Sequence, residues 1–279
     1  MTRVRRVSLK RVLKGVFRGV LRFTAVHKSS YLVVLAREID RTFGIGYGND
    51  DAKCLINCLR FLGVKAPVIL DIGANTGQFA RSIIDVEPTC KVFAFEPGSV
   101  ARQNFDSALL TGNVVEVIPL ALSDRSGTAH LFCDSPGSEL SSLTRRNLDH
   151  RQIDFRDYET VEVITVDEWC RIRSVSPDAL KIDVEGHELQ VLFGADSILE
   201  KVRVVQFEFG GTSIDTRTFF RDFFSFFDNR NFLLYRKSPA GLLHVRRYSE
   251  ELERFVYSNW IAVRTNLEES NALLNAVNS

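Results

Sequence analysis

The 279-residue chain has no apolar run near the ~18–20 residues that a membrane-spanning helix needs, and no uninterrupted apolar core like that of a signal peptide. Its five cysteines are scattered, odd in number and without zinc-ribbon spacing, which argues against a disulfide framework and a structural zinc site. The formal net charge is only +1, so no global field attracts nucleic acid. These absences favour a protein of a reducing, cytoplasmic compartment without a nucleic-acid partner.

Acidic residues are missing from residues 1–37, which carry ten Lys and Arg. Within residues 4–23 apolar residues recur at helical spacing, and four basic residues spaced four apart form a stripe beside them. Such a helix can pack on the rest of the chain with its basic edge in water, or it can lie on an anionic membrane surface. The pattern favours packing, and it leaves peripheral membrane contact through residues 4–23 as the alternative.

A short apolar strand, a glycine turn and a helix follow one another over residues 68–85. The turn reads Asp71-x-Gly73-x-Asn75-x-Gly77. Backbone N–H groups at the start of the helix lack an intrahelical partner and suit a small polar or anionic group. We expect Gly73 to let the chain turn and Gly77 to let a ligand or a strand pack close to the backbone.

Polar side chains occur at the ends of several predicted strands. Glu96 ends the strand after the glycine turn, close to the ~20-residue spacing at which an acid accepts hydrogen bonds from a ribose diol. Strands that alternate with helices predict a mostly parallel sheet covered on both faces, with ligands at the carboxyl ends of its strands. One site is therefore expected near Asp71, Glu96, Ser123, Asp124, Asp183 and Glu208.

The ligand is not a nicotinamide dinucleotide, because the pattern Gly-x-Gly-x-x-Gly is absent. An acid before the first glycine suits a ligand with a cationic amino group, such as S-adenosylmethionine. Asp71 can serve its ammonium group directly or through water, and Glu96 can bind the ribose diol. Ser123 and Asp124 can approach the adenine edge. The predicted cofactor-binding residues are Asp71, Gly73, Asn75, Gly77, Glu96, Ser123 and Asp124.

Over residues 67–263 the chain resembles the FkbM family of S-adenosylmethionine-dependent methyltransferases. The resemblance rests on six blocks in this order: VILDIGANTGQFA, VFAFEPGSVARQNF, VIPLALSDRSGTAHL, ITVDEW, LKIDVEGHELQVLFGA and VVQFEF. Asn75 stands where the general methyltransferase motif has its middle glycine, which is usual for this family. The resemblance implies a class I methyltransferase (Rossmann-like) α/β fold. Such a fold has seven main strands, mostly parallel, with the last one antiparallel and inserted between the fifth and sixth.

The resemblance also implies methyl transfer, usually to a hydroxyl of a sugar, glycolipid, polyketide or similar acceptor. The alternatives are an N- or C-methyltransferase of the same fold and an inactive S-adenosylmethionine-binding or membrane-associated module. We expect residues 1–50 to form a basic helical extension, residues 51–266 the methyltransferase domain and residues 267–279 a polar, frayed tail. The acceptor pocket should be built from the polar excursion at residues 134–160, the N-terminal helices and the loops after Glu208 and Tyr235.

Removal of a hydroxyl proton calls for a general base. Asp183 ends a predicted strand, and His187 has a suitable unperturbed pKa. With Glu208, these are the predicted catalytic residues. Glu185 is a further candidate base, or it caps the following helix. A divalent ion between Asp183 and Glu208 would suit carboxylate chemistry, but nothing in the spacing demands it and no metal site is predicted.

Overall fold

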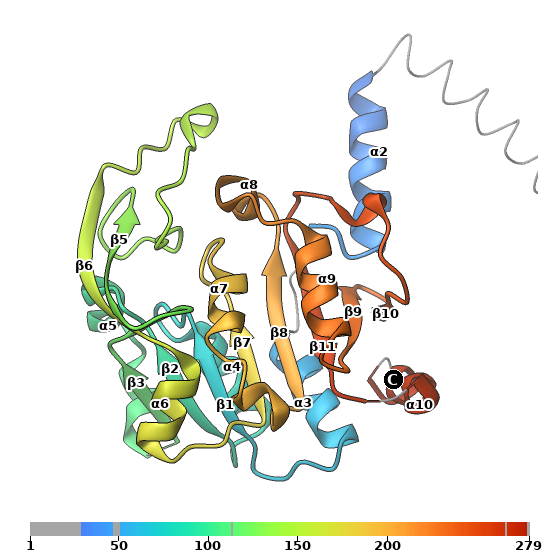
Figure 1. Ribbon diagram of the computed structural model, residues 1–279. Helices are drawn as coiled ribbons and strands as arrows, with labels where there is room; N and C mark the ends of the chain where they lie inside the picture. The colour runs from blue at the N-terminus through green and yellow to red at the C-terminus, as the bar shows by residue number, and fades with distance from the viewer. Residues whose placement is uncertain (1–28, 47–50, 113, 266, 278–279) are drawn as a thin grey trace, which may run out of the picture.

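The computed structural model describes residues 29–46, 51–112, 114–265 and 267–277, and the chain is shown in Figure 1. The basic helix expected at residues 4–23 lies outside these ranges. Among the described residues, no helix combines the length and apolarity needed to span a bilayer.

The main sheet has eight strands in the order β10-β9-β11-β8-β7-β1-β2-β3. β11 runs antiparallel to both of its neighbours, β8 and β9, while β1, β2, β3, β7 and β8 run parallel. This is the predicted class I order, with β10 added at one edge. The strands are β1 (Val68–Ile72), β2 (Lys91–Phe95), β3 (Val115–Ile118), β7 (Ala179–Ile182), β8 (Val204–Phe209), β9 (Leu233–Ser238), β10 (Gly241–His244) and β11 (Ser258–Val263).

Helices cover both faces of the sheet because its central strands are apolar on both sides. One core joins the sheet to Trp169, Leu192 and the phenylalanines of α9, and the other joins it to α3, α4 and α10. The helices are α2 (Ser29–Thr42), α3 (Asp51–Phe61), α4 (Gln78–Val86), α5 (Ser99–Gln103), α6 (Val166–Arg173), α7 (Glu188–Phe193), α8 (Thr212–Thr216), α9 (Phe220–Asp228) and α10 (Leu267–Val277), with 3-10 turns at Ser107–Gly112, Asp149–Arg151, Ile198–Glu200 and Glu250–Leu252.

The predicted excursion is built on a second, three-stranded sheet of β4 (Ala121–Leu122), β6 (Asp157–Ile164) and β5 (Gly127–Cys133). β6 begins at Asp157, inside the excursion predicted for residues 134–160, because it pairs with the full length of β5. Figure 1 shows β5, β6 and their connection rising beyond the carboxyl ends of the main strands. Residues 134–156 therefore lie beside the expected site.

The expectation of a frayed tail from residue 267 is wrong. Residues 267–277 form α10, which packs against α3 and buries Leu273 completely. The buried Tyr235 hydroxyl donates to Ser270 Oγ at 2.9 Å. A few inward-facing apolar side chains are enough to hold a short helix whose other faces are polar. With so few apolar residues, their helical spacing is weak and easily missed in the sequence. By contrast, α2 leaves Val33, Ile39 and other apolar side chains exposed.

Candidate functional site

The glycine turn after β1 is shaped by close packing inside the protein. Gly73 has φ +82°, and a Cβ there would lie 1.8 Å from the carbonyl oxygen of Asp183. Gly77 has φ +87°, and a Cβ there would lie 2.6 Å from the ring of Phe105. Gly73 thus lets the ends of β1 and β7 touch, while the space beside Gly77 holds an aromatic ring, which corrects the expectation of a ligand or a strand.

Asn75 occupies the middle position of the turn with φ +46°. Asparagine tolerates this left-handed conformation because its short side chain can bond locally, and here Asn75 Oδ1 accepts a hydrogen bond from Thr76 N at 2.7 Å. A third glycine is therefore not needed for the turn to form.

Glu96, just after β2, is 7% exposed, and backbone amides fix both of its oxygens. Oε2 accepts from Asn75 N at 2.8 Å, and Oε1 accepts from Gly98 N at 2.7 Å. Burial raises the pKa of Glu96, and the two N–H groups counter that rise. Each carboxylate oxygen keeps a further lone pair for a ligand. A narrow cavity of about 60 Å³ lies beside Glu96, with Phe95, Leu120 and Leu143 among its walls.

Asp71 is completely buried. It lines neither the narrow cavity beside Glu96 nor a larger cavity at the ends of β7 and β8. Its neighbour on β7, Lys181, places Nζ 3.2 Å from Asp71 Oδ1 and 3.6 Å from Asp183 Oδ2. Lys181 also donates to the Gly73 carbonyl at 3.1 Å. Burial raises the pKa of Asp71. Burial also lowers the pKa of Lys181, but the carboxylates of Asp71 and Asp183 outweigh this effect and hold the pKa of Lys181 above its usual value.

The predictions missed Lys181, although a lysine inside the apolar strand Ala-Leu-Lys-Ile is a visible signal in the sequence. This ion pair and the complete burial of Asp71 keep its carboxylate out of both cavities, so of the two predicted forms of contact only the one through water stays open. The expectation of direct contact between Asp71 and an ammonium group is therefore wrong.

A larger cavity of about 580 Å³ opens at the ends of β7 and β8, where Asp183, Glu185 and Glu208 line it. Burial and the neighbouring Asp183 raise the pKa of Glu185 to about 7. Burial, followed by repulsion from Asp183, Glu185 and Glu188, raises the pKa of Glu208 well above its usual value. This side of the site therefore holds more carboxyl groups than it has cations to neutralise.

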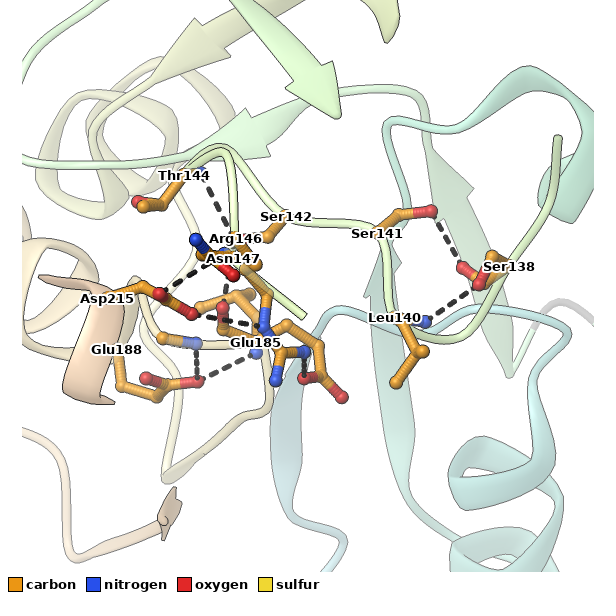
Figure 2. Close-up of polar contacts among 12 residues, drawn as sticks. Ser138, Leu140, Ser141, Ser142, Thr144, Arg146, Asn147, Glu185, Glu188 and Asp215 are labelled. Carbon is orange, nitrogen blue, oxygen red and sulfur yellow. Dashed lines mark hydrogen bonds and ion pairs between the residues drawn. The ribbon is translucent and has the colours of Figure 1, made fainter. Parts of the chain in front are cut away.

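Arg146 brings the excursion into the site (Figure 2). Its guanidinium is 5% exposed and donates from Nη1 to Glu185 Oε2 at 2.6 Å, while Nε lies 3.7 Å from Asp215 Oδ2. Ser142 Oγ adds a hydrogen bond to the carbonyl of Glu185 at 2.8 Å. Residues 134–156 are thus fixed against the acidic end of the cavity, where an acceptor pocket is predicted.

His187 lies apart from the acids of the cavity. Its Nε2 is 2.8 Å from Ser123 Oγ, and Ser123 donates to Asp124 Oδ1 at 3.0 Å. Burial lowers the pKa of His187, and Asp124 partly offsets this effect. The structure thus joins a predicted catalytic residue to two predicted adenine-binding residues, and none of the three lines the two cavities.

The far wall of the larger cavity comes from the start of α3 and from β11 with the residues just before it. Asn259 on β11 donates to Asp51 Oδ2 at 2.7 Å and to the hydroxyl of Tyr257 at 3.0 Å. Asp51 begins α3 and also pairs with Lys237. No group of three or more His, Cys, Asp or Glu within the described ranges is arranged to hold a metal ion.

Comparison with known proteins assigns this site to a family. The sequence model of the methyltransferase FkbM domain matches residues 71–234, more than half of the chain. The chain belongs to the FkbM methyltransferase family. The match includes the glycine turn, Glu96 and the acids after β7 and β8.

Curated relatives carry more specific names. The chain is 30% identical over 154 residues to the 2-O-methyltransferase NoeI of Sinorhizobium fredii, a match that covers 51% of this chain and 63% of the relative. It is 34% identical over 145 residues to the hexuronic acid methyltransferase AglP of Haloferax volcanii, covering 50% and 54%. The chain therefore spans only about half to two thirds of the length of these relatives.

Among solved structures, an O-methyltransferase of Thermotoga maritima aligns with a TM-score of 0.37 at 14% identity, covering 79% of this chain and 67% of that one. The fold assignment rests instead on the strand order and on the antiparallel β11.

Proposed function

We propose that this FkbM-family protein transfers a methyl group from S-adenosylmethionine to a hydroxyl of a sugar or related glycan acceptor. The observation that carries the proposal is the meeting of the two cavities at the glycine turn: both are lined by Gly73, Asn75, Glu139, Asp183 and Glu185. A nucleoside with a charged side arm suits such a pair of joined spaces. The names of NoeI and AglP support an oxygen on a sugar as the acceptor.

The residues present fit this methyl donor. Glu96 would hold the ribose diol, and the apolar walls at Phe95, Leu120 and Leu143 would flank the adenine. The turn and the start of α4 would hold the methionine end. A polar atom also lacks a partner among the described residues: Gln206 lines the larger cavity, is 4% exposed, and leaves Oε1 unbonded. When bound, S-adenosylmethionine supplies a methyl group made electrophilic by a positively charged sulfur.

The carboxyl groups of the larger cavity supply the remaining chemistry. Asp183 and Glu208 line the cavity and can accept a proton from a hydroxyl group that lies between them and the turn. Burial and the neighbouring acids raise the pKa of Glu208, which makes its carboxylate a stronger proton acceptor than an ordinary glutamate. His187 is bonded to Ser123 outside the cavity, so we assign it to holding the start of α7. Arg146 fixes Glu185 at the rim of the cavity.

The test is methyl transfer from isotopically labelled S-adenosylmethionine to a panel of neutral, amino and uronic acid sugars, with the product linkage read by mass spectrometry. We expect ether products, and Asp183→Asn or Glu208→Gln should lower kcat by about 10²-fold or more. Glu162→Gln, an exposed acid on β6, is the matched control. Calorimetry that shows no binding of S-adenosylmethionine or S-adenosylhomocysteine would reject the function, and products methylated on nitrogen or carbon would replace it with one of the alternatives.

We also propose that residues 1–50 form an extension to the catalytic domain that contacts anionic membranes, with the domain running from residue 51 through α10 to residue 277. The ten Lys and Arg of positions 1–37, most of which lie before residue 26, support membrane contact. Co-sedimentation of the full chain and of residues 26–279 with anionic vesicles tests this; equal sedimentation of both would contradict it.

A further inference from the structure

The carboxyl groups at the ends of β7 and β8 face the place where the two cavities join. We infer that the carboxylates of Asp183, Glu185 and Glu208 make this site bind the positively charged methyl donor more tightly than the neutral product that remains after transfer. This inference rests on the proposed function, because it concerns the same site and the same ligand.

The first support is position. The narrow cavity holds Glu96, and the larger cavity holds the turn and the start of α4. A ligand that fills both must pass the residues they share, which include three acids: Glu139, Asp183 and Glu185. The sulfur of S-adenosylmethionine links its ribose to its methionine chain, so it is the part of the ligand that passes this junction.

The second support is charge. Lys181 is already shared between Asp71 and Asp183, and Arg146 between Glu185 and Asp215. Glu208 has no cation of its own among the ion pairs of the described residues, and Glu188, buried beneath the cluster, has only backbone N–H donors. Burial and the nearby Asp183 raise the pKa of both Glu185 and Glu188 to about 7. A cation at the junction would lower the repulsion among these groups.

The third support is independent of the acids. The side chain of Gln206 is buried among β7, β8 and the cavity, and its Oε1 has no donor within the described residues. An unpaired buried carbonyl is unfavourable unless a ligand supplies the donor. Its partial negative charge lies on the same side of the cavity as Asp183 and Glu208. Gln206 Oε1 and the carboxyl groups of this wall therefore favour a cation or an N–H donor, while Lys181 on the same wall is already paired with Asp71 and Asp183.

Because methyl transfer removes the positive charge of the donor, a wall that favours a cation also favours the methyl donor over the product left after transfer. Methyl transfer breaks the sulfur–carbon bond and leaves its electron pair on the sulfur, while the acceptor oxygen gains the methyl group and gives its proton to a carboxylate. The donor loses its positive charge in this step, and one carboxyl group becomes neutral. The attraction that held the donor at the junction is then lost, and release of S-adenosylhomocysteine is favoured.

Calorimetry on the full chain at pH 8 tests this without an acceptor. We expect S-adenosylhomocysteine to bind at least about tenfold more weakly than S-adenosylmethionine. Sinefungin, which carries an amino group in place of the sulfonium, should bind like the cationic donor. Asp183→Asn and Glu208→Gln should each reduce the ratio of S-adenosylmethionine affinity to S-adenosylhomocysteine affinity several-fold, while Glu162→Gln should leave this ratio unchanged. Thermal melting checks that each variant is folded.

The outcomes separate the two proposals. Equal affinities for the two ligands, or tighter binding of S-adenosylhomocysteine, would overturn the inference and leave the proposed function standing. A wild-type preference that survives in the folded Asp183 and Glu208 variants would also overturn it, since the selectivity would then come from other groups. Failure of all three ligands to bind would instead reject the proposed function.

Discussion

Two regions of the site differ in how their buried carboxyl groups are satisfied. After β2, Glu96 is a single carboxyl group whose two oxygens each accept a backbone N–H. At the carboxyl ends of β7 and β8, Asp183, Glu185 and Glu208 crowd one cavity. The cations near them, Lys181 and Arg146, are shared with other acids. The first region is complete without a ligand, whereas the second is left with excess negative charge.

This difference indicates which region binds by shape and which by charge. A carboxylate held by backbone amides is already oriented, so a ribose diol can bind to it with little rearrangement. A group of repelling carboxyl groups lowers the stability of the folded protein and is relieved only by a proton or a cation. The two regions touch where Gly73 meets the carbonyl of Asp183, so they form one site.

The largest effect is expected from separating the two regions with Gly73→Ala. The added Cβ would overlap the Asp183 carbonyl in a left-handed backbone conformation, so the free energy of unfolding should fall by about 4 kcal/mol or more. Urea denaturation measures this loss. Gly63→Ala is the matched control, because Gly63 has φ +74° with no atom near its Cβ position and should cost only about 1–2 kcal/mol. Equal losses in the two variants would mean that the close contact is unimportant.

Glu96→Ala tests the region that binds by shape. Loss of the carboxylate should weaken the binding of S-adenosylmethionine by about 1–3 kcal/mol, and that of S-adenosylhomocysteine by a similar amount, since both carry the ribose. Calorimetry with both ligands gives the two values. Unchanged affinity would remove Glu96 from the ribose role, and a change confined to one ligand would contradict the division between the two regions.

Glu208→Gln tests the stability of the charged region. The pKa of Glu208 is raised in the folded protein, so the folded state binds a proton more tightly than the unfolded state does. This carboxyl group therefore lowers stability as the pH rises from its unfolded pKa toward its folded pKa, and the full loss is present above the latter. The variant should be more stable than the wild type at pH 8, and the two should be nearly equal at pH 4, just below the unfolded pKa of about 4.3.

Denaturant titrations of the wild type, Glu208→Gln and the exposed-acid control Glu162→Gln at both pH values measure the effect. A Glu208→Gln variant that is less stable at pH 8 would show that the carboxylate is satisfied in the folded protein.

The smallest effect is expected from Asn75→Gly. Glycine would relieve the strain of φ +46°, but it would lose the bond to Thr76 and increase the freedom of the unfolded chain. These terms nearly cancel, so stability and donor affinity should each change by less than about 1 kcal/mol. A loss of donor affinity well beyond that would give the Asn75 side chain a direct role in binding.

Much of the site follows from local patterns in the sequence. The strand, the turn with its two glycines and the helix are determined by residues close together in the chain, and Glu96 is found by its distance from the turn. Lys181 was missed because its meaning depends on Asp71, a residue of the neighbouring strand more than 100 positions away. Arg146 and Asn259 were missed for the same reason, since each contacts acids on distant segments.

The sequence by itself determined the order of strands and helices, the turn and the family, because these depend on apolar periodicity and on glycine positions within short windows. The tertiary structure alone decided which charges pair. In the folded chain Lys181 pairs with Asp71, Ser123 is hydrogen-bonded to His187, and the ring of Phe105 fills the space beside Gly77. The sequence alone does not show these contacts, because they depend on how strands align side by side and how segments pack. Packing also places Asp183, Glu185 and Glu208 together in the lining of one cavity.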